Sequence, residues 1–409
     1  VLACRQPHTL ALLLVALDGF AARMLLMPPQ ADADAARQWL RSLGCDHFPA
    51  VADVPGLCDT ALIVPDCATW RAAAATRDDH LPRTDRSTEW LIPTSGTSGP
   101  PKLVAHSLQS LTRTARPGPP PHGEPLRWGL LYELHRFAGL QVLFQAWLGD
   151  ATLIIPDSIQ DLEGAVATFA AARCTALSAT PSMWRKLMMS RTAAELPLRQ
   201  ITLGGEIADQ SILSALAARY PRARIVHIYA STEAGVGFSV RDGRAGFPAS
   251  YLQCPPAGIE LQVRDDGILL VRPAQCHQHY VGRAERVTDA DGWINTGDLV
   301  KQRDDRIHFV GRANGAINVG GRKVMPEEIE TVILRVEGVA LARVSARRSS
   351  ILGNLVEASI VPHPQFTPSD IRVRVEQACT ESLEDYKRPA VLRVVPTIDL
   401  SPAGKLTRT

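Results

Sequence analysis

Residues 90–102 read WLIPTSGTSGPPK, an apolar run followed by glycine and hydroxyl side chains and a terminal lysine. The run at 90–92 predicts a buried strand, and residues 103–111 predict an apolar helix. Glycines let the backbone point several N–H groups into one concavity, which binds phosphate oxygens. A flexible Ser/Gly linker is the alternative, but it has no reason to lie between two buried elements. The spacing also differs from GxxxxGK[ST]. The predicted phosphate-contacting residues are Thr94, Ser95, Gly96, Thr97, Ser98, Gly99 and Lys102.

Outward from this loop, short apolar runs alternate with helical patterns. The runs predict strands at 62–64, 153–155, 200–203 and 225–228. The helical patterns predict helices at 32–43, 162–172, 181–189 and 209–219. Strands that alternate with helices indicate a mostly parallel sheet covered by helices, and therefore an α/β fold.

The pattern changes after about Tyr251. Residues 259–263 and 267–271 predict a hairpin around Asp265-Asp266-Gly267, and further hairpin-like strands continue to about Phe309. Beyond 311–315 the pattern predicts a helix at 326–336, strands at 341–347 and 355–361, a helix at 368–383 and a strand at 390–395. This is the size of a small α+β domain. We therefore expect a large domain over 1–313 and a small domain over 314–409.

Composition limits the classes of function. The 409 residues carry 44 Lys and Arg against 42 Asp and Glu, so neither nucleic acid nor an anionic membrane is expected as the main partner. Eight scattered cysteines predict buried thiols in a reducing cytoplasm. The apolar run at 10–17 loosely resembles a signal peptide, but Asp18 and Arg23 interrupt it. We expect a buried helix there, following a short first strand.

Three further motifs carry candidate site residues. Glu233 follows the predicted strand at 225–228, where ligands bind in open α/β sheets, and a carboxylate there suits Mg²⁺. Asp298 lies in Thr296-Gly297-Asp298 and could accept hydrogen bonds from paired hydroxyls. Lys405 lies in the segment SPAGKLTR at 401–408. Taken singly, Glu233 is more typical of a surface glutamate and Lys405 of a solvated tail lysine, and Thr-Gly-Asp is also ordinary turn sequence.

In this order, the motifs resemble those of the acyl-adenylate-forming superfamily, which includes acyl- and aryl-CoA ligases, adenylation domains of peptide synthetases, and luciferases. The resemblance covers nearly the whole chain. It implies a large domain with mostly parallel sheets and a distorted β-barrel-like part, and a small mobile α+β domain. The loop begins at residue 94, earlier than in most members, so we expect an abbreviated N-terminal subdomain.

The resemblance also implies residue roles. Lys405 would bridge the substrate carboxylate and the nucleotide, Thr232 would bind the α-phosphate, and Glu233 would bind Mg²⁺. Asp298 and Arg312 would bind the ribose. The remaining residues expected around the nucleotide are Gly205, Glu206, Tyr229, Ala230 and Ser231. Asn314 stands at the hinge position, where Asp or Lys is more usual, and Gly320 and Gly321 would flank the thiol channel.

The expected acid pocket begins at His135, which matches a gating or catalytic residue but could equally be a buried structural histidine. Amino-acid-activating relatives place an Asp just after this position, and Arg136 stands there instead. We therefore expect an aryl or acyl acid and not an α-amino acid; Arg136 could pair with a second carboxylate or with CoA phosphates. The other predicted pocket residues are Phe137, Gly139, Gly204, Gly235 and Val236.

The expected activity is ATP- and Mg²⁺-dependent formation of an acyl-adenylate with release of pyrophosphate, then acyl transfer to a thiol, foremost that of CoA. Loading of a carrier-protein phosphopantetheine shares all these motifs and stays open. A non-catalytic adenylate-binding protein is disfavoured because Glu233, Asp298 and Lys405 are all present. The expected partners are thus a carboxylic acid, ATP, and CoA or a carrier protein, and a homodimer is left open.

Overall fold

The computed structural model describes residues 6–19, 21–28, 38–39, 41, 43, 87–94, 102–118, 123–275, 279–349 and 353–408. The helix expected at 32–43 and the strand expected at 62–64 lie largely or wholly outside them. The chain forms two compact units. The first joins Val1–Ile155, Ser231–Val236 and Pro273–Ile294, and the second joins Pro156–Ala230, Gly237–Arg272 and Asn295–Thr409. The boundaries of these units differ from the predicted domain boundary at residue 313. The predicted domains, 1–313 and 314–409, stay a prediction.

The first unit contains a sheet in the order β1 (Arg23–Leu25), β2 (Glu89–Pro93) and β3 (Leu103–His106). β1 is parallel to β2, and β3 is antiparallel to it. The helix expected at 103–111 is wrong over its first half. All four residues of β3 are buried and pair with β2, and helix α4 (Leu108–Thr112) begins only after Ser107. A short apolar run does not by itself distinguish a strand from a buried helix.

Helix α1 (Pro7–Leu17) begins with a proline, whose missing N–H needs no partner in the first turn. The helix buries Leu10 and Leu14 but leaves Leu12 59% and Val15 53% exposed. The prediction of a buried helix at 10–17 is therefore right for one face only. The same unit contains β4 (Arg127–Gly129), α5 (Phe137–Leu148) and β5 (Thr152–Ile154), with β4 parallel to β5.

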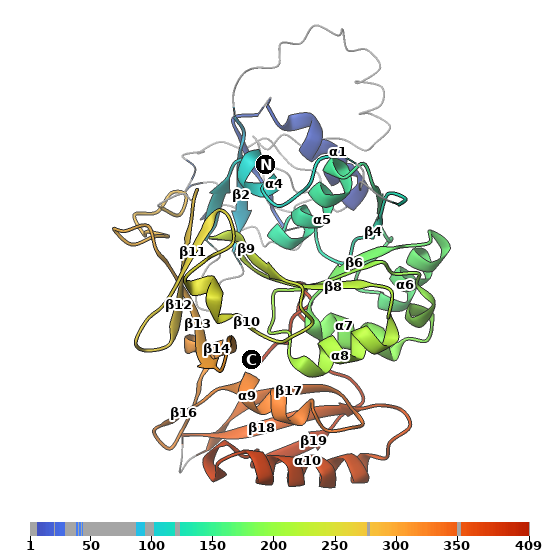
Figure 1. Cartoon of the computed structure of the whole chain (residues 1–409), viewed down its shortest axis with the longest axis vertical. Coiled ribbons are helices and arrows are strands. Elements are labelled where there is room, and N and C mark those ends of the chain that lie inside the picture. The colour runs from blue at the N-terminus through green and yellow to red at the C-terminus, as the bar shows by residue number, and fades with distance from the viewer. Residues whose placement is uncertain are drawn as a thin grey trace, which may run out of the picture. The chain divides into compact units, whose positions relative to one another are not determined.

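The second unit contains the predicted alternation of parallel strands and helices. The strands are β6 (Ala176–Ala179), β7 (Gln200–Gly204) and β8 (Arg224–Ser231), and β7 pairs in parallel with both neighbours. The helices are α6 (Leu162–Ala171), α7 (Pro181–Met189) and α8 (Gln210–Arg219), and Figure 1 shows α7 beside α8. Each helix begins after a residue that accepts a backbone N–H: Asp161, Thr180 and Asp209. The predicted α/β class is confirmed.

A five-stranded sheet of the second unit corresponds to the predicted barrel-like part. Its order is β10 (Phe247–Pro248), β14 (Arg306–Arg312), β13 (Ile294–Arg303), β12 (Ile268–Pro273) and β11 (Ile259–Val263). The predicted hairpin at 259–271 forms β11 and β12. β13 and β14 are antiparallel, and their register shifts between Leu299 and Val300. Such irregularities bend a sheet and increase its local twist.

The C-terminal part of the second unit is the predicted α+β arrangement. Its sheet has the order β16 (Arg322–Val324), β15 (Ile317–Val319), β18 (Gly353–Pro362) and β17 (Val339–Ser349), and β19 (Val391–Val394) is parallel to β18. Helices α9 (Pro326–Ile333) and α10 (Pro368–Ser382) contact each other and this sheet (Figure 1). Buried residues of both helices, including Ile329, Ile333, Ile371 and Val375, share one apolar core with the strands.

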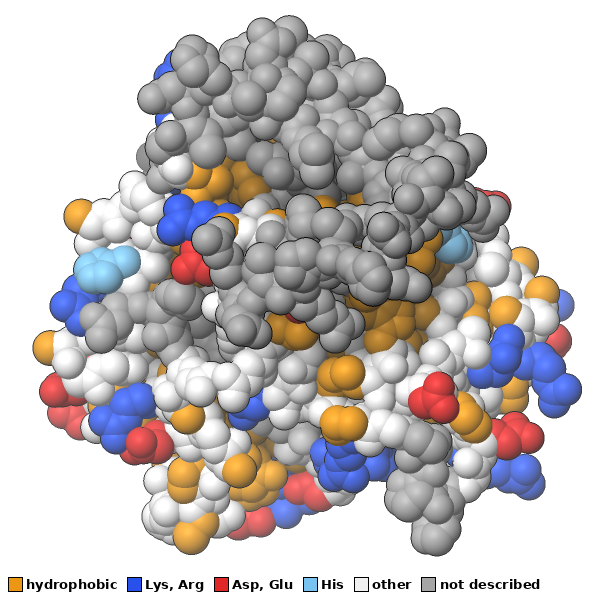
Figure 2. Space-filling view, turned by 90° about the horizontal axis from the view of Figure 1, so that it is seen from above, with side chains coloured by type: hydrophobic (Ala, Val, Ile, Leu, Met, Phe, Trp, Pro, Cys, Tyr) orange, Lys and Arg blue, Asp and Glu red, His pale blue; other side chains and the backbone are white. Residues whose placement is uncertain are grey.

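Charged side chains of both signs lie on the face shown in Figure 2, where Lys and Arg are interspersed with Asp and Glu. The thiols test a prediction from composition. Cys174 and Cys379 are buried, but Cys254 is exposed, so the expectation of buried thiols is wrong at that position. Burial raises the pKa of the Cys379 thiol to about 11. Among the described residues, no helix is long and apolar enough to cross a bilayer.

Candidate functional site

The two ends of the predicted phosphate loop are joined in the first unit. Thr94 donates its N–H to the carbonyl of Lys102 at 2.8 Å, and the Lys102 N–H returns a bond to Thr94 Oγ1 at 3.3 Å. The ladder of β2 and β3 continues directly from this pair. Residues 95–101, which include the predicted Ser95, Gly96, Thr97, Ser98 and Gly99, lie outside the described residues. The structure thus fixes where the loop leaves the sheet and where it returns.

The Lys102 ammonium lies against two side chains that the sequence analysis missed. It forms an ion pair with Glu285 and lies 4.7 Å from the ring centroid of Tyr280. The Tyr280 hydroxyl donates in turn to Glu233 Oε1 at 3.4 Å. One tyrosine therefore lies between the predicted phosphate cation and the predicted Mg²⁺ ligand. No motif marks Tyr280 or Glu285, and only the fold brings them here.

The backbone beside Glu233 is held by a buried histidine, which the sequence analysis also missed. His106 Nε2 lies 2.7 Å from the carbonyl oxygen of Thr232, and Nδ1 lies 3.1 Å from Ser110 Oγ. Because a carbonyl oxygen can only accept, Nε2 carries a proton. The ring also packs 5.5 Å from that of Phe137. His106 thus fixes the turn that presents Thr232 and Glu233.

These residues fit a magnesium ion that arrives with a nucleotide. Mg²⁺ keeps several waters and binds through one or two carboxylates together with substrate phosphates. Glu233 supplies one carboxylate. In the ranges that the structure describes, no group of three or more His, Cys, Asp or Glu side chains could hold a metal alone. The donor set therefore suits Mg²⁺ bound jointly by Glu233 and phosphate oxygens.

In the second unit, Tyr229 lies between two aromatic rings and holds a carboxylate. Its ring stacks on Phe238 and on Phe309, each with a centroid distance of 5.2 Å. Its hydroxyl donates to Asp298 Oδ2 at 2.7 Å. Burial and the neighbouring Asp298 charge raise the pKa of Tyr229 well above its ordinary value. The phenol therefore stays protonated and remains a donor.

Asp298 and Arg312, the predicted ribose-binding pair, face each other across β13 and β14. Arg312 Nε lies 3.0 Å from Asp298 Oδ1. Arg312 also donates to the carbonyl of Thr296 at 2.8 Å, and the Asp298 N–H donates to Thr296 Oγ1 at 3.0 Å. Each carboxylate oxygen keeps a second acceptor site, so Asp298 is held in place and can still accept ligand hydroxyls.

Lys405 lies beside Gly205, which directly follows β7. A Cβ on Gly205 would lie 3.1 Å from Lys405 Cε and 3.6 Å from its Nζ, so the absence of a side chain lets the lysine approach. Glu206, predicted to contact the nucleotide, accepts backbone N–H groups with both oxygens, from Leu406 at 2.8 Å and from Ser182 at 3.0 Å. Its role at the nucleotide stays a prediction, and its contact with the lysine segment is new.

The predicted pocket residue His135 is 3% exposed and lies next to a buried acid that was missed. His135 Nε2 is 3.1 Å from Glu133 Oε2, and Arg136 Nε is 2.7 Å from the same oxygen. Burial raises the pKa of Glu133, but His135 and Arg136 outweigh it, and the pKa lies below its ordinary value. Arg136, expected to face a second carboxylate or CoA phosphates, is thus paired with Glu133.

The other predicted pocket residues divide between the units. Phe137 begins α5, and its ring lies 3.9 Å from where a Cβ on Gly235 would be. Val236 follows, and its carbonyl accepts a bond from Arg113. Gly139 lies in the same helix as Phe137. Gly204 ends β7 and belongs to the second unit.

The remaining predicted positions lie at turns. Ala230 and Ser231 end β8. Asn314 lies in a single 3₁₀ turn, Ala313–Gly315, that follows β14. Gly320 and Gly321 have φ values of +56° and +85° and form the two-residue turn between β15 and β16, a conformation that glycine adopts without strain. Their proposed roles at a hinge and a thiol channel stay predictions.

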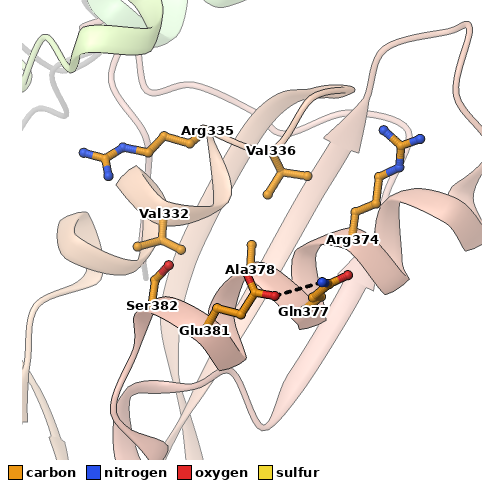
Figure 3. A pocket seen from close by; sticks show the side chains of 8 residues that line it. All are labelled: Val332, Arg335, Val336, Arg374, Gln377, Ala378, Glu381 and Ser382. Atoms are coloured by element: carbon orange, nitrogen blue, oxygen red, sulfur yellow. Dashed lines mark hydrogen bonds between the residues drawn. The ribbon is translucent and has the colours of Figure 1, made fainter.

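A groove of about 410 Å³ lies between α9 and α10 (Figure 3). Figure 3 shows Arg335 and Arg374 at its two sides and a hydrogen bond from Gln377 to Glu381, which is 2.8 Å long. None of the residues that line it belongs to a predicted motif. The groove is therefore separate from the candidate site.

Comparison with known proteins matches the arrangement to one family. Residues 22–275 match the family described as AMP-binding enzyme, and residues 328–405 match the AMP-binding enzyme C-terminal domain. Surfactin synthase subunit 1 of Bacillus subtilis (strain 168) is 28% identical over 79% of this chain and 10% of its own length. The 2-succinylbenzoate–CoA ligase of Bacillus licheniformis is 27% identical over 77% of this chain and 68% of its own length.

The fold also resembles solved structures. The anthranilate CoA ligase AuaEII, solved in complex with anthranoyl-AMP, superposes with a TM-score of 0.74 at 19% sequence identity. The match covers 93% of this chain and 80% of that one. At this identity the likeness concerns the fold alone. The chain spans only a small part of surfactin synthase subunit 1 and about two thirds of the 2-succinylbenzoate–CoA ligase.

Proposed function

Because the chain belongs to the AMP-binding enzyme family, we propose that it activates a carboxylic acid with MgATP to an acyl-adenylate and then transfers the acyl group to a thiol. The position of Lys405 carries this proposal. The lysine lies beside Gly205, just past the end of β7, where ligands bind in open α/β sheets. A tail lysine held there can neutralise charge where a carboxylate and a phosphate meet.

In the first half-reaction, a carboxylate oxygen attacks the α-phosphorus of ATP. The bond between the α-phosphorus and the bridging oxygen breaks, pyrophosphate leaves, and acyl-AMP remains. No covalent nucleophile from the protein is required, since positioning and charge stabilisation account for catalysis of this kind. Lys405 would contact both the carboxylate and the phosphate, and Mg²⁺ would supply charge neutralisation for the leaving group.

The contacts within each unit support the assigned roles. Glu233, held through Tyr280 and next to the carbonyl that His106 fixes, would bind Mg²⁺. Thr232 would bind the α-phosphate, and Lys102 the outer phosphates. Asp298, fixed by Tyr229 and Arg312, would accept the two ribose hydroxyls.

In the second half-reaction, a thiol attacks the carbonyl of the adenylate and AMP leaves. CoA is the acceptor that we favour, since the chain covers 68% of a 2-succinylbenzoate–CoA ligase. A phosphopantetheine on a carrier protein is the second candidate, because the chain also resembles a segment of surfactin synthase subunit 1. The hinge at Asn314 and the turn at Gly320 and Gly321 would serve either acceptor.

For the acid, we propose an aryl or medium-chain acyl group and not an α-amino acid. The residue after His135 is Arg136, and Arg136 and His135 both lie against Glu133. A cationic residue at this position offers no partner for an ammonium group. The Phe137 ring lies 3.9 Å from where a Cβ on Gly235 would be, and an apolar ring beside a glycine would suit a flat or short apolar group.

Pyrophosphate exchange into ATP with a panel of benzoates, fatty acids and amino acids tests the proposal. We expect exchange that depends on Mg²⁺ and on an aryl or acyl acid. Strong exchange with an amino acid alone would refute the substrate class, and no exchange with any acid would refute the activity. Once an acid is known, CoA and a phosphopantetheinylated carrier protein can be compared as acceptors by mass spectrometry.

A further inference from the structure

The segment that carries Lys405 is a closed turn. Leu400 and Leu406 form an isolated antiparallel bridge. Within it, the Ser401 N–H donates to the Lys405 carbonyl at 2.7 Å, and the Lys405 N–H donates to Ser401 Oγ at 3.2 Å. The lysine is therefore presented by a rigid turn, residues 401–406, which we call the lysine turn.

Two side chains of the second unit, Thr180 before α7 and Glu206 after β7, form hydrogen bonds with the backbone of the lysine turn. Thr180 Oγ1 donates to the carbonyl of Gly404, and Glu206 Oε1 accepts the N–H of Leu406 at 2.8 Å. These contacts fall on the residues immediately before and after Lys405. In Figure 1 the red C-terminal tail runs beside α7, in agreement with these contacts. Hydrogen bonds to both neighbours of Lys405 fix the position of its backbone, from which the side chain extends.

Both holding groups are themselves fixed at the start of α7. Thr180 is 1% exposed, and its Oγ1 also accepts the Met183 N–H at 3.1 Å as the helix N-cap. Glu206 Oε2 accepts the Ser182 N–H at 3.0 Å. A carboxylate is favoured near the N–H groups of a helix N-terminus. Thr180 and Glu206 are thus prepared to receive the lysine turn and need not reorganise.

The other end of the tail is held by a different partner. Arg408 contacts Glu330 Oε2 at 2.6 Å and Glu327 Oε1 at 3.0 Å, both on α9. Arg408 and α9 lie within the predicted small domain, whereas Thr180 and Glu206 lie within the predicted large one. If the small domain turns at Asn314, the contacts with Arg408 travel with the tail and those with Thr180 and Glu206 break.

We propose that Thr180 and Glu206 are positioning residues that latch the lysine turn in place for acyl-AMP formation and release it before the thiol step. The proposal deepens the proposed function and rests on it. It predicts that the latch favours the first half-reaction only. In a variant without the latch, Lys405 spends less time at the site of acyl-AMP formation, so the first half-reaction slows. The transfer of the acyl group to the thiol is not slowed, because the lysine turn has already left the site at that step.

Half-reaction assays on the full chain test the latch. Glu206→Gln keeps one acceptor oxygen for two backbone N–H groups, and Thr180→Val removes the hydroxyl while keeping the shape. We expect pyrophosphate release to fall about 10-fold in each variant, as the loss of one or two hydrogen bonds implies. In Thr180→Val, whose side chain has no predicted contact with the nucleotide, thioester formation from supplied acyl-adenylate should stay within about 2-fold of the wild-type chain. Thr180→Ser restores the hydroxyl and should recover the first half-reaction.

Trypsin provides a readout that needs no activity, because it cleaves after Lys405. Release of the lysine turn should speed the appearance of chains ending at Lys405 at least about 5-fold, at a temperature well below the melting temperature of each variant. Glu260→Gln is the matched control, since this exposed carboxylate pairs only with Arg272 among the described contacts. It should change neither cleavage nor either half-reaction.

A double variant separates positioning from general damage. If Glu206 acts through Lys405, adding Glu206→Gln to Lys405→Ala should cause no further loss of pyrophosphate release. Additive losses, equal losses in both half-reactions, or unchanged cleavage after Lys405 would each overturn the latch. If the wild-type chain activated no acid, the proposed function would fail, and the cleavage rates would still decide whether Thr180 and Glu206 hold the lysine turn.

Discussion

The Tyr229 hydroxyl donates a hydrogen bond of 2.7 Å to Asp298 Oδ2, and both residues belong to the second unit. The tyrosine ring is stacked between Phe238 and Phe309, so the donor has little freedom to turn away. Arg312 holds the other carboxylate oxygen at 3.0 Å. The orientation of Asp298 is therefore set by two groups whose own positions are fixed, as a preorganised binding site requires.

The first prediction is that Tyr229→Phe weakens ATP binding more than it slows the reaction. The substitution keeps the stacked ring but removes the donor that orients Asp298. Since a hydrogen bond to a charged group contributes about 1.5–3 kcal/mol, we expect KM for ATP to rise roughly 10-fold while kcat changes less than about 2-fold. Steady-state kinetics measure both.

Tyr251→Phe is the matched control for this variant. Its hydroxyl donates only a 3.4 Å bond to the Ser239 carbonyl, and its ring lies in the same aromatic cluster, against Phe238. We expect no change in KM for ATP. Equal effects of the two substitutions would mean that the cluster, and not the bond to Asp298, determines nucleotide affinity.

The second prediction concerns the ion pair of Lys102 with Glu285. Glu285 pairs with the Lys102 ammonium and so competes with the phosphate oxygens that this ammonium would contact. Glu285→Gln should therefore lower KM for ATP about 2-fold at low ionic strength. The gain should vanish in about 0.5 M salt, since the two side chains are 32% and 49% exposed and salt screens such pairs. A KM that rises in the variant would show that Glu285 assists binding by orienting Lys102.

Much of the fold was predictable because the patterns are local. The helix expected at 181–189 and the strand expected at 259–263 match α7 and β11 at both ends. The N-cap Thr180 and Pro181 mark the start of α7, and the turn at 265–267 follows β11. The run at 103–106 was misassigned because three apolar residues followed by a histidine satisfy either pattern. The run forms a strand because it pairs with β2. No local sequence pattern predicts that pairing.

The site was predictable only where a motif marked it. Glu233, Asp298 and Lys405 belong to motifs, and the structure gives each a partner. Tyr280, Glu285 and Thr180, which contact Glu233, Lys102 and Gly404, carry no motif. They approach from distant segments: 183 residues separate Lys102 from Glu285, and 224 separate Thr180 from Gly404. Such contacts follow from tertiary packing, and neither periodicity nor spacing predicts them.

The third prediction is a dependence of stability on pH through Asp209, the N-cap of α8. Burial raises the pKa of Asp209, but the charge of Arg185 and hydrogen bonds from Ser211 and Ile212 outweigh it, so the pKa is below its ordinary value. The carboxylate therefore stabilises the fold above the unfolded-state pKa of about 4, and this stabilisation is lost as pH falls through the lower folded-state pKa.

Asp209→Asn isolates the charge, because asparagine is an equally good N-cap. At pH 7 it leaves Arg185 without its 2.6 Å partner, and we expect the free energy of unfolding to fall by about 1–3 kcal/mol. The difference from the wild-type chain should narrow below about pH 4. Urea unfolding at several pH values measures it. Asp266→Asn, at an exposed aspartate, should show no measurable change, and a loss independent of pH would argue against the charge.

The last prediction is that Lys405→Ala separates the two half-reactions. Lys405 would neutralise charge only while the carboxylate attacks the α-phosphorus. We therefore expect pyrophosphate release to fall at least about 100-fold. Thioester formation from supplied acyl-adenylate should be unaffected, because the thiol attacks after the lysine turn has left. Lys301→Ala, at an exposed position of β13, is the control and should alter neither step. Pyrophosphate release within a few-fold of the wild-type rate would mean that another group meets the carboxylate and the phosphate, and that the place of Lys405 beside Gly205 serves stability.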